Sequence, residues 1–120
     1  MREQNPSTTC TSLIKRLYRC RWARPALSVL AAMPGQCRQA DLAVALVART
    51  GHLVHHRALS HAMSYLVEHG LVRRHDRPGQ VTYEITALGR ALHTHLQSLE
   101  RLLREHHVPD EAGCAGSRCN

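Results

Sequence analysis

Histidine is the residue type of this sequence best suited to binding a metal ion, and four of the ten histidines fall in one short stretch. They are His52, His55, His56 and His61. A zinc site needs about four ligands that converge on one point, and adjacent residues of a helix point in different directions. The spacing therefore predicts no metal site and no cofactor. A metal-responsive regulator built from histidines and cysteines is kept as an alternative.

Five cysteines could supply thiol chemistry, but their number is odd and their spacing is not that of a metal finger or a disulfide framework. They are Cys10, Cys20, Cys37, Cys114 and Cys119. The sequence lacks the apolar stretch of a signal peptide or a bilayer span, so we expect a cytoplasmic protein with reduced cysteines. Cys20 and Cys37 are expected to pack as small hydrophobic residues. No nucleophile motif surrounds any cysteine, and we expect no enzymatic activity.

Arginine dominates the charge of the chain, and its side chain is suited to phosphate. Fifteen of the sixteen basic residues are arginine, and the net charge is +7 at pH 7. A guanidinium can donate two parallel hydrogen bonds to one phosphate group. The composition therefore predicts a polyanionic partner without naming it. A basic domain that has no such partner is the alternative.

Hydrophobic spacing predicts the elements that must position these side chains. Apolar residues recur at helical intervals in residues 11–21, 24–33, 39–49 and 55–69. Two short strands, residues 71–75 and 80–85, flank the turn residues 76–79 and form a hairpin with a basic tip. Thr86 is placed to cap a long final helix that carries regularly spaced leucines.

The segment 55–69 is the one most typical of a DNA-reading helix. Leu59, Met63 and Leu66 lie at positions i, i+4 and i+7 and form its buried stripe. The opposite face presents Arg57, Ser60, His61 and Ser64. Two consecutive helices, the second with a small polar outer face, followed by a hairpin are typical of a winged helix-turn-helix.

The predicted architecture is mainly α-helical with a small β-hairpin: a three-helix core plus a wing, with the first and last helices used for dimerisation. A chain of 120 residues has room for one such domain. We expect a flexible N-terminus over residues 1–10, the domain with its dimerisation helices over residues 11–107, and a flexible cysteine-containing tail over residues 108–120.

Three motifs carry a resemblance to a known family. The first is Arg21-Trp22 followed by the helix of residues 27–30, the second runs from Leu59 through residues 70–73, and the third is residues 81–90, Val-Thr-Tyr-Glu-Ile-Thr-Ala-Leu-Gly-Arg. They resemble the HxlR-type family of bacterial winged-helix regulators, relatives of the MarR group, over about residues 13–105. The stretch 48–56 is longer and richer in histidine than the family's turn, and the wing tip keeps one proline, Pro78.

The resemblance and the helix pattern together predict a DNA-binding transcription regulator, a repressor that binds a pseudo-palindromic double-stranded operator as a homodimer and associates with the nucleoid. The residues expected to contact DNA are Gln39, His56, Arg57, Ser60, His61, Ser64, Arg74 and Arg77. A winged-helix module that docks onto another protein and does not bind DNA is the main alternative.

The resemblance also implies where two subunits meet and what signal they could receive. Dimerisation is expected through Leu13, Leu17, Leu92, Leu96, Leu99 and Leu103. Some members of the family sense oxidants or electrophiles through a cysteine ahead of the Trp motif. Cys10 is the redox candidate here, with Cys114 or Cys119 of the other subunit as its partner, because a helix N-terminus favours the thiolate. Idle thiols near the chain ends are the alternative, and a small-molecule effector is left open.

Overall fold

The computed structural model describes residues 6–106, with side chains from Ser12 onward. Its helices are α1 (Pro6–Arg19), α2 (Ala23–Ala32), α3 (Gln39–Thr50), α4 (His56–Glu68) and α5 (Ala87–Glu105). Its strands are β1 (Cys37–Arg38), β2 (Val72–Arg77) and β3 (Gln80–Ile85). The chain divides into two compact units, residues 1–90 and 91–120, which are described separately.

The observed elements confirm the predicted fold class, a mainly helical winged helix-turn-helix. Four differences stand out. Helix α1 begins at Pro6 rather than at residue 11, so it reaches into the segment expected to be flexible. Strand β2 extends to Arg77 and shortens the turn, the first residue of α4 is His56, and the two-residue strand β1 was not predicted. The division into flexible ends and one domain stays a prediction, and its tail lies outside the described residues.

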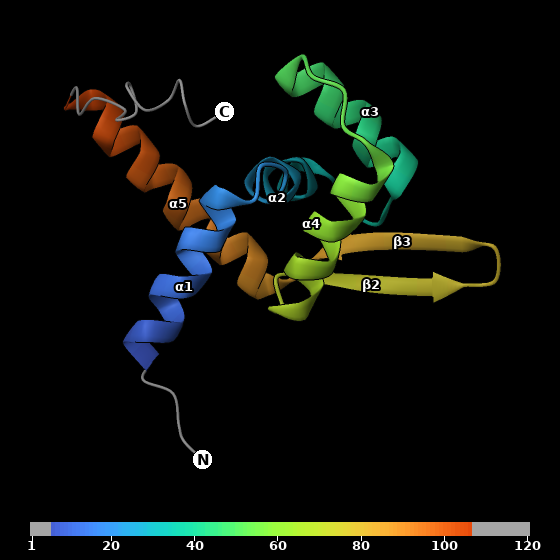
Figure 1. Cartoon of the computed structure of the whole chain (residues 1–120), viewed down its shortest axis with the longest axis horizontal. Coiled ribbons are helices and arrows are strands. Elements are labelled where there is room, and N and C mark those ends of the chain that lie inside the picture. The colour runs from blue at the N-terminus through green and yellow to red at the C-terminus, as the bar shows by residue number, and fades with distance from the viewer. Residues whose placement is uncertain (1–5, 107–120) are drawn as a thin grey trace. The chain divides into compact units, whose positions relative to one another are not determined.

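Helix α2 is the centre of the first unit because it packs against α1, α3 and α4 (Figure 1). Leu27 and Leu30 of α2 are buried. Further leucines and one methionine complete the core: Leu42 and Leu46 of α3, and Leu59, Met63 and Leu66 of α4. Burial of a leucine or methionine side chain contributes roughly 1.5–3 kcal/mol, so these residues stabilise the packing of the helices on one another. The predicted stripe of α4 is therefore confirmed as core.

The turn of the helix-turn-helix is five residues long, and hydrogen bonds at its start stabilise its conformation. Gly51 ends α3 in the left-handed region, at φ 77°, where a Cβ is disfavoured. The Thr50 hydroxyl donates to the Leu46 carbonyl at 2.8 Å and accepts from the His52 amide at 3.1 Å. Val54 is buried and ties the turn to the core, while Leu53 is exposed. These contacts fix where α4 begins despite the long connection.

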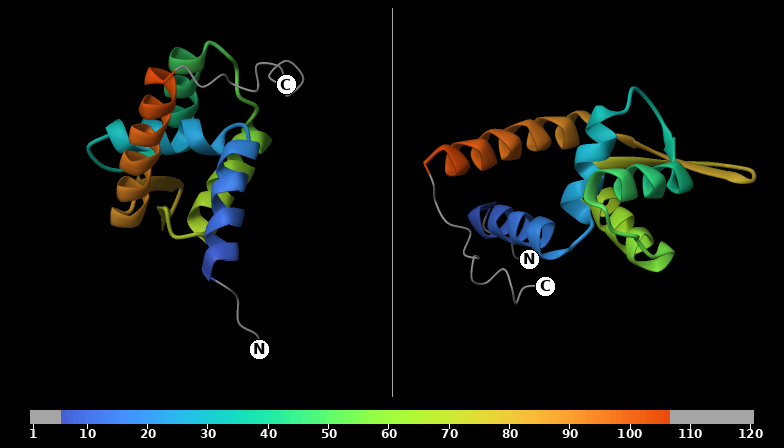
Figure 2. Two further views of the ribbon diagram at one scale, coloured as in Figure 1. Left: turned by 90° about the vertical axis from the view of Figure 1, so that its left-hand side faces the viewer. Right: turned by 90° about the horizontal axis from the view of Figure 1, so that it is seen from above.

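The wing is an antiparallel hairpin that belongs to a three-stranded sheet of order β1-β3-β2. Arg77 pairs with Gln80, so Pro78 and Gly79 form a two-residue loop. Proline followed by a glycine of positive φ, here 74°, is typical of a type II turn. Figure 2 shows the hairpin extending beyond α3 and α4.

The junction between the wing and α5 is held by Thr86. Its hydroxyl accepts from the Gly89 amide at 3.0 Å, which confirms the predicted helix cap, and donates to the Gly70 carbonyl at 2.7 Å. Its own amide donates to the Leu71 carbonyl at 3.0 Å. The start of α5 is thereby attached to the segment that joins α4 to β2.

The second unit contains the remainder of α5. Leu99, Leu102 and Leu103 of this helix are between 42 and 50% exposed. None of the helices in residues 6–106 is long and apolar enough to span a bilayer.

Candidate nucleic-acid interface

The outward face of α4 carries the polar residues that the sequence predicted there. His56, Arg57, His61 and Ser64 are exposed, and Ser60 is half-buried. The helix is amphipathic because its core residues recur every three or four positions, which leaves one continuous polar strip. All of these side chains except Ser60 are open to a ligand that lies along the helix.

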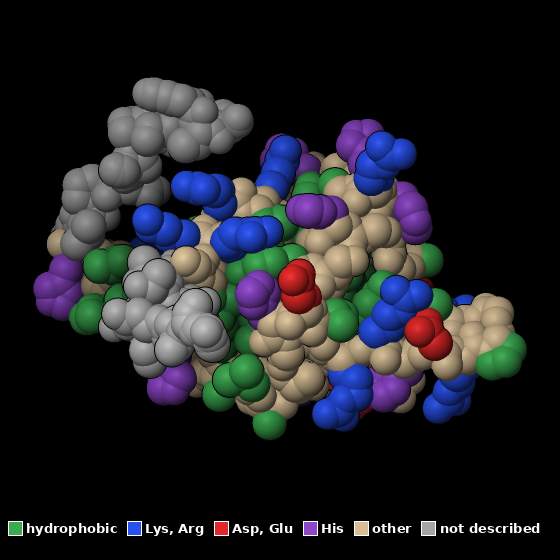
Figure 3. All heavy atoms as spheres, turned by 60° about the horizontal axis from the view of Figure 1, so that its bottom comes forward, with side chains coloured by type: hydrophobic (Ala, Val, Ile, Leu, Met, Phe, Trp, Pro, Cys, Tyr) green, Lys and Arg blue, Asp and Glu red, His purple; other side chains and the backbone are tan. Residues whose placement is uncertain are grey.

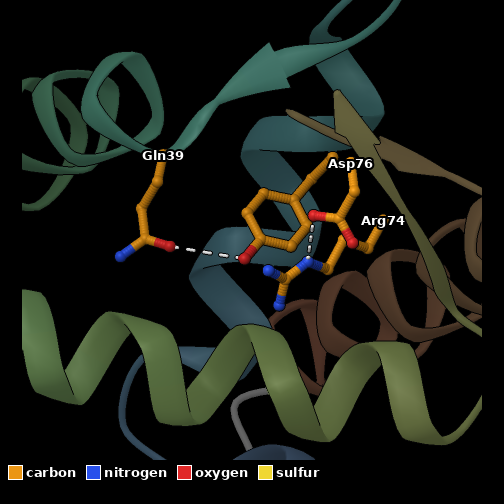
Figure 4. A network of polar contacts seen from close by, with 4 residues as sticks. Gln39, Arg74 and Asp76 are labelled. Atoms are coloured by element: carbon orange, nitrogen blue, oxygen red, sulfur yellow. Dashed lines mark hydrogen bonds and ion pairs between the residues drawn. The ribbon is translucent and has the colours of Figure 1, made fainter. Parts of the chain in front are cut away.

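Gln39, at the start of α3, contacts two residues of this strip through its side-chain amide. Its amide nitrogen donates to the Ser60 hydroxyl at 3.0 Å and lies 3.2 Å from Nδ1 of His56. Its carbonyl oxygen accepts from the Tyr83 hydroxyl at 3.4 Å (Figure 4). Since an amide nitrogen can only donate, Nδ1 of His56 accepts and the ring presents its other nitrogen as a donor. Gln39 therefore ties α4 to β3 and sets the orientation of two predicted contact residues.

Tyr83 is a residue of this candidate site that the sequence did not single out. The sequence placed Tyr83 only within the predicted strand 80–85, and its side chain is buried. Its hydroxyl reaches Gln39 because β1 pairs with β3 and places Cys37 opposite Tyr83, two residues before Gln39. A two-residue strand has no periodicity to detect, so no sequence signal revealed this link.

The wing presents its two predicted arginines on opposite faces, because side chains three residues apart on a strand point to opposite sides. Arg74 shares the face of Tyr83 and lies near Ser64, and its guanidinium pairs with Asp76 at 3.0 Å (Figure 4). Both partners of that pair are about half-exposed or more, so the pair adds little stability. Arg77 lies beside the turn and is exposed, as is Arg73 on the same face.

The charge of this surface suits a polyanion. Blue and purple side chains are spread across the face shown in Figure 3, whereas red ones are few. Glu68 is the only acidic residue of α4, and Asp41 the only one of α3. A basic surface attracts DNA through its phosphates, whatever the base sequence.

The histidines of this surface, His56 and His61 among them, are the side chains that could bind a metal ion. Within residues 6–106, no three His, Cys, Asp or Glu side chains gather as a metal site would require. Cys37 is buried, which raises the pKa of its thiol, and the nearby Asp41 carboxylate adds to that rise. Cys20 is half-buried. The redox candidates Cys10, Cys114 and Cys119 lie outside the described side chains, so their role stays a prediction.

The predicted dimerisation residues differ in exposure. Leu17 is buried and Leu13 half-buried. On α5, Leu96 is buried, Leu92 is half-buried, and Leu99 and Leu103 are exposed. Only exposed side chains are accessible to a partner without rearrangement, so Leu99 and Leu103 are the residues on which dimerisation can be tested.

A helix-turn-helix with a polar outward face on its second helix, followed directly by a basic hairpin, defines the winged helix-turn-helix class of DNA-binding proteins. The family model of the HxlR-like helix-turn-helix matches residues 19–111, most of the chain. The chain therefore belongs to the HxlR-like helix-turn-helix family, as its motifs predicted, and its class is that of a DNA-binding transcription regulator. No curated protein matches it.

Proposed function

We propose that this protein is a sequence-specific transcription repressor that binds a double-stranded operator as a homodimer. The observation that carries the proposal is the exposed polar strip of α4, held in place by Gln39 and followed by a basic wing. An α-helix fits the major groove of B-DNA, where each base pair presents a distinct set of donors and acceptors. Occupation of the operator by the dimer would block transcription.

The residues divide between base reading and backbone contact. Arg57 can donate two hydrogen bonds to a guanine, and His61 and Ser64 follow it along the same strip. Arg77 at the wing would contact phosphate, which positions the protein without reading sequence. Gln39 acts as a positioning residue, because its amide group is already bonded to Ser60, His56 and Tyr83.

The dimer is supported by the apolar face of α5. Leu99, Leu102 and Leu103 occupy positions i, i+3 and i+4, so they share one face of the helix. Exposed leucines grouped in this way commonly mark a protein interface. A second copy of the chain would bring two α4 helices to one operator, and the twofold symmetry of the pair would match a pseudo-palindrome.

Replacing Leu99 with glutamate should dissociate this dimer, because the carboxylate would be moved into an apolar contact without a partner. Sedimentation velocity at micromolar concentration should show a dimer for the wild type and a monomer for Leu99→Glu. Gln97→Glu is the matched control, since Gln97 is exposed on the opposite side of the same helix and should keep the dimer. A monomeric wild type at this concentration would refute the proposed interface.

Enrichment of bound duplexes from a random library tests the DNA-binding proposal. We expect an inverted repeat whose half-site centres are separated by about one helical turn, roughly 10 base pairs. Failure to enrich any duplex would favour the alternative, a winged-helix module that docks onto a protein. Enrichment of a single half-site would contradict the homodimer but leave DNA binding intact.

A further inference from the structure

Four arginines gather where the end of α1 meets the first half of α4, all within the first unit. They are Arg16, Arg19 and Arg21, from α1 and the turn after it, and Arg57 of α4. All four are exposed, and none forms an ion pair with an acidic side chain among residues 12–106. No aspartate or glutamate among these residues lines the groove that they share. The first three, here the α1 arginines, therefore keep their charge available to an anion.

Two of the α1 arginines are held in place by buried aromatic rings. Arg16 lies over the ring of Tyr65, 5.0 Å from its centroid. Arg21 lies over the ring of Trp22, at 5.2 Å. Both rings are buried, and the Tyr65 hydroxyl donates to the Leu13 carbonyl at 3.1 Å. A cation–π contact fixes the plane of a guanidinium and leaves its N–H groups free to donate, so both groups are oriented before an anion binds.

The α1 arginines and the wing lie on opposite sides of the polar strip of α4. The residues of α4 on the side of the α1 arginines are Arg57, Ala58, His61 and Tyr65. Ser64 and Val67, on the other flank of the helix, line a hollow together with Arg74 of the wing. A rotation of about 100° per residue separates these two flanks and leaves the exposed strip between them. Figures 1 and 2 agree, because α4 lies between α1 and the wing in both.

We propose that the α1 arginines bind the DNA backbone that borders the major groove on the side away from the wing. This inference rests on the proposed function, in which α4 enters the major groove. That groove is about 12 Å wide and is bordered by one backbone of each strand. With Arg77 of the wing on one backbone, the α1 arginines donate to phosphate oxygens of the other. The two sets of contacts hold α4 in the groove from both sides.

A duplex backbone suits these arginines better than a small anion or a single strand does. A strand of B-DNA presents one phosphate about every 3.4 Å along its axis, so it can engage several cations at once. One small anion would leave most of the guanidinium groups without a counter-ion. Single-stranded nucleic acid binds largely by stacking its bases on aromatic side chains. Here the rings of Trp22 and Tyr65 are buried and already covered by arginines.

Neutral methylphosphonate groups, placed one at a time in the enriched operator, test the proposal with the wild-type protein. We expect weaker binding when either backbone beside a half-site is made neutral, one through the wing and the other through the α1 arginines. The loss of one phosphate contact should lower the affinity about tenfold at about 0.1 M salt, because roughly one counter-ion is no longer released. Weaker binding only for the backbone on the side of the wing would overturn the proposal.

Variants assign each backbone to its arginines. Arg21→Ala should bind the unmodified operator about tenfold more weakly, with a salt slope smaller by about 1. It should also be insensitive to at least one neutral phosphate on the backbone away from the wing, and Arg77→Ala to one on the backbone beside the wing. Arg49→Ala is the control for net charge, since Arg49 lies outside the groove and donates to the Ser28 hydroxyl. Equal weakening in Arg21→Ala and Arg49→Ala would overturn the proposal.

The remaining outcomes separate this inference from the proposed function. Wild-type affinity and salt slope in Arg21→Ala would overturn the proposed contact and leave operator binding by α4 standing. Absence of duplex binding by the wild type would overturn the proposed function, and this contact with it. Inorganic phosphate, compared with chloride at equal ionic strength, should not displace the operator. Displacement by phosphate alone would assign the α1 arginines to a free anion and overturn the backbone contact.

Discussion

Replacing Gly89 with alanine is expected to lower the free energy of unfolding by roughly 3 kcal/mol, because the new methyl group has no space. A Cβ at this position would collide with the Leu71 carbonyl oxygen and lie 2.9 Å from Cγ1 of Ile85. The carbonyl has little freedom to move, since it accepts the Thr86 amide hydrogen bond at 3.0 Å. Alanine favours a helix over glycine by about 1 kcal/mol, so a loss of stability here would have to come from the collision.

Urea unfolding followed by circular dichroism measures this effect. Gly35→Ala provides the control, because a Cβ at Gly35 meets no atom within 4 Å and its φ is not positive. That variant should stay within about 0.5 kcal/mol of the wild type. If Gly89→Ala unfolds at the same urea concentration as Gly35→Ala, the close packing of α5 onto the segment before β2 is wrong.

Replacing Arg57 with alanine should weaken binding to the enriched operator by roughly 1–3 kcal/mol. Arg57 is exposed at the start of α4 and has no acidic partner among the described side chains, so its guanidinium is available to a base edge. The variant should also lose its discrimination between bases at one base pair of each half-site, because the bidentate contact from Arg57 is what distinguishes that base. Fluorescence anisotropy with the operator and with single-base variants measures both effects.

Arg77→Ala is the variant to compare with it. Arg77 lies beside the turn of the wing, where we propose a phosphate contact, so its loss should weaken all duplexes alike and reduce the salt slope by about 1. If Arg57→Ala instead behaves like Arg77→Ala, α4 contacts only the backbone. If Arg57→Ala has no effect on any duplex, the outward strip of α4 is not the reading surface.

The helices could be predicted from the sequence because their apolar residues recur at helical spacing and so lie on one buried face. Leu59, Met63 and Leu66 are all buried, and the helix they define differs from the predicted range by one residue at each end. The Thr86 cap was also predictable, since a threonine before a helix offers its hydroxyl to an amide three residues on. For the buried face of α4 and for the Thr86 cap, residue spacing along the sequence was sufficient to predict the structure.

The parts that depend on contacts between distant segments were not predictable. Strand β1 exists only through its pairing with β3, and the bond from Tyr83 to Gln39 spans 44 residues. The groove beside α4 likewise joins residues of α1 and α4 that share no spacing in the sequence. Gln39 was predicted as a DNA contact, whereas its bonds to Ser60, His56 and Tyr83 support a positioning role.

The salt dependence of binding to the enriched operator and to a scrambled duplex tests the central claim most directly. Between about 50 and 200 mM salt, the logarithm of the association constant should fall linearly with the logarithm of the salt concentration, because each phosphate contact releases counter-ions. The operator should bind at least about a thousandfold more tightly than the scrambled duplex at every salt concentration. Equal affinity for the two duplexes, or no measurable binding to either, would contradict sequence-specific recognition of DNA by α4 and the wing.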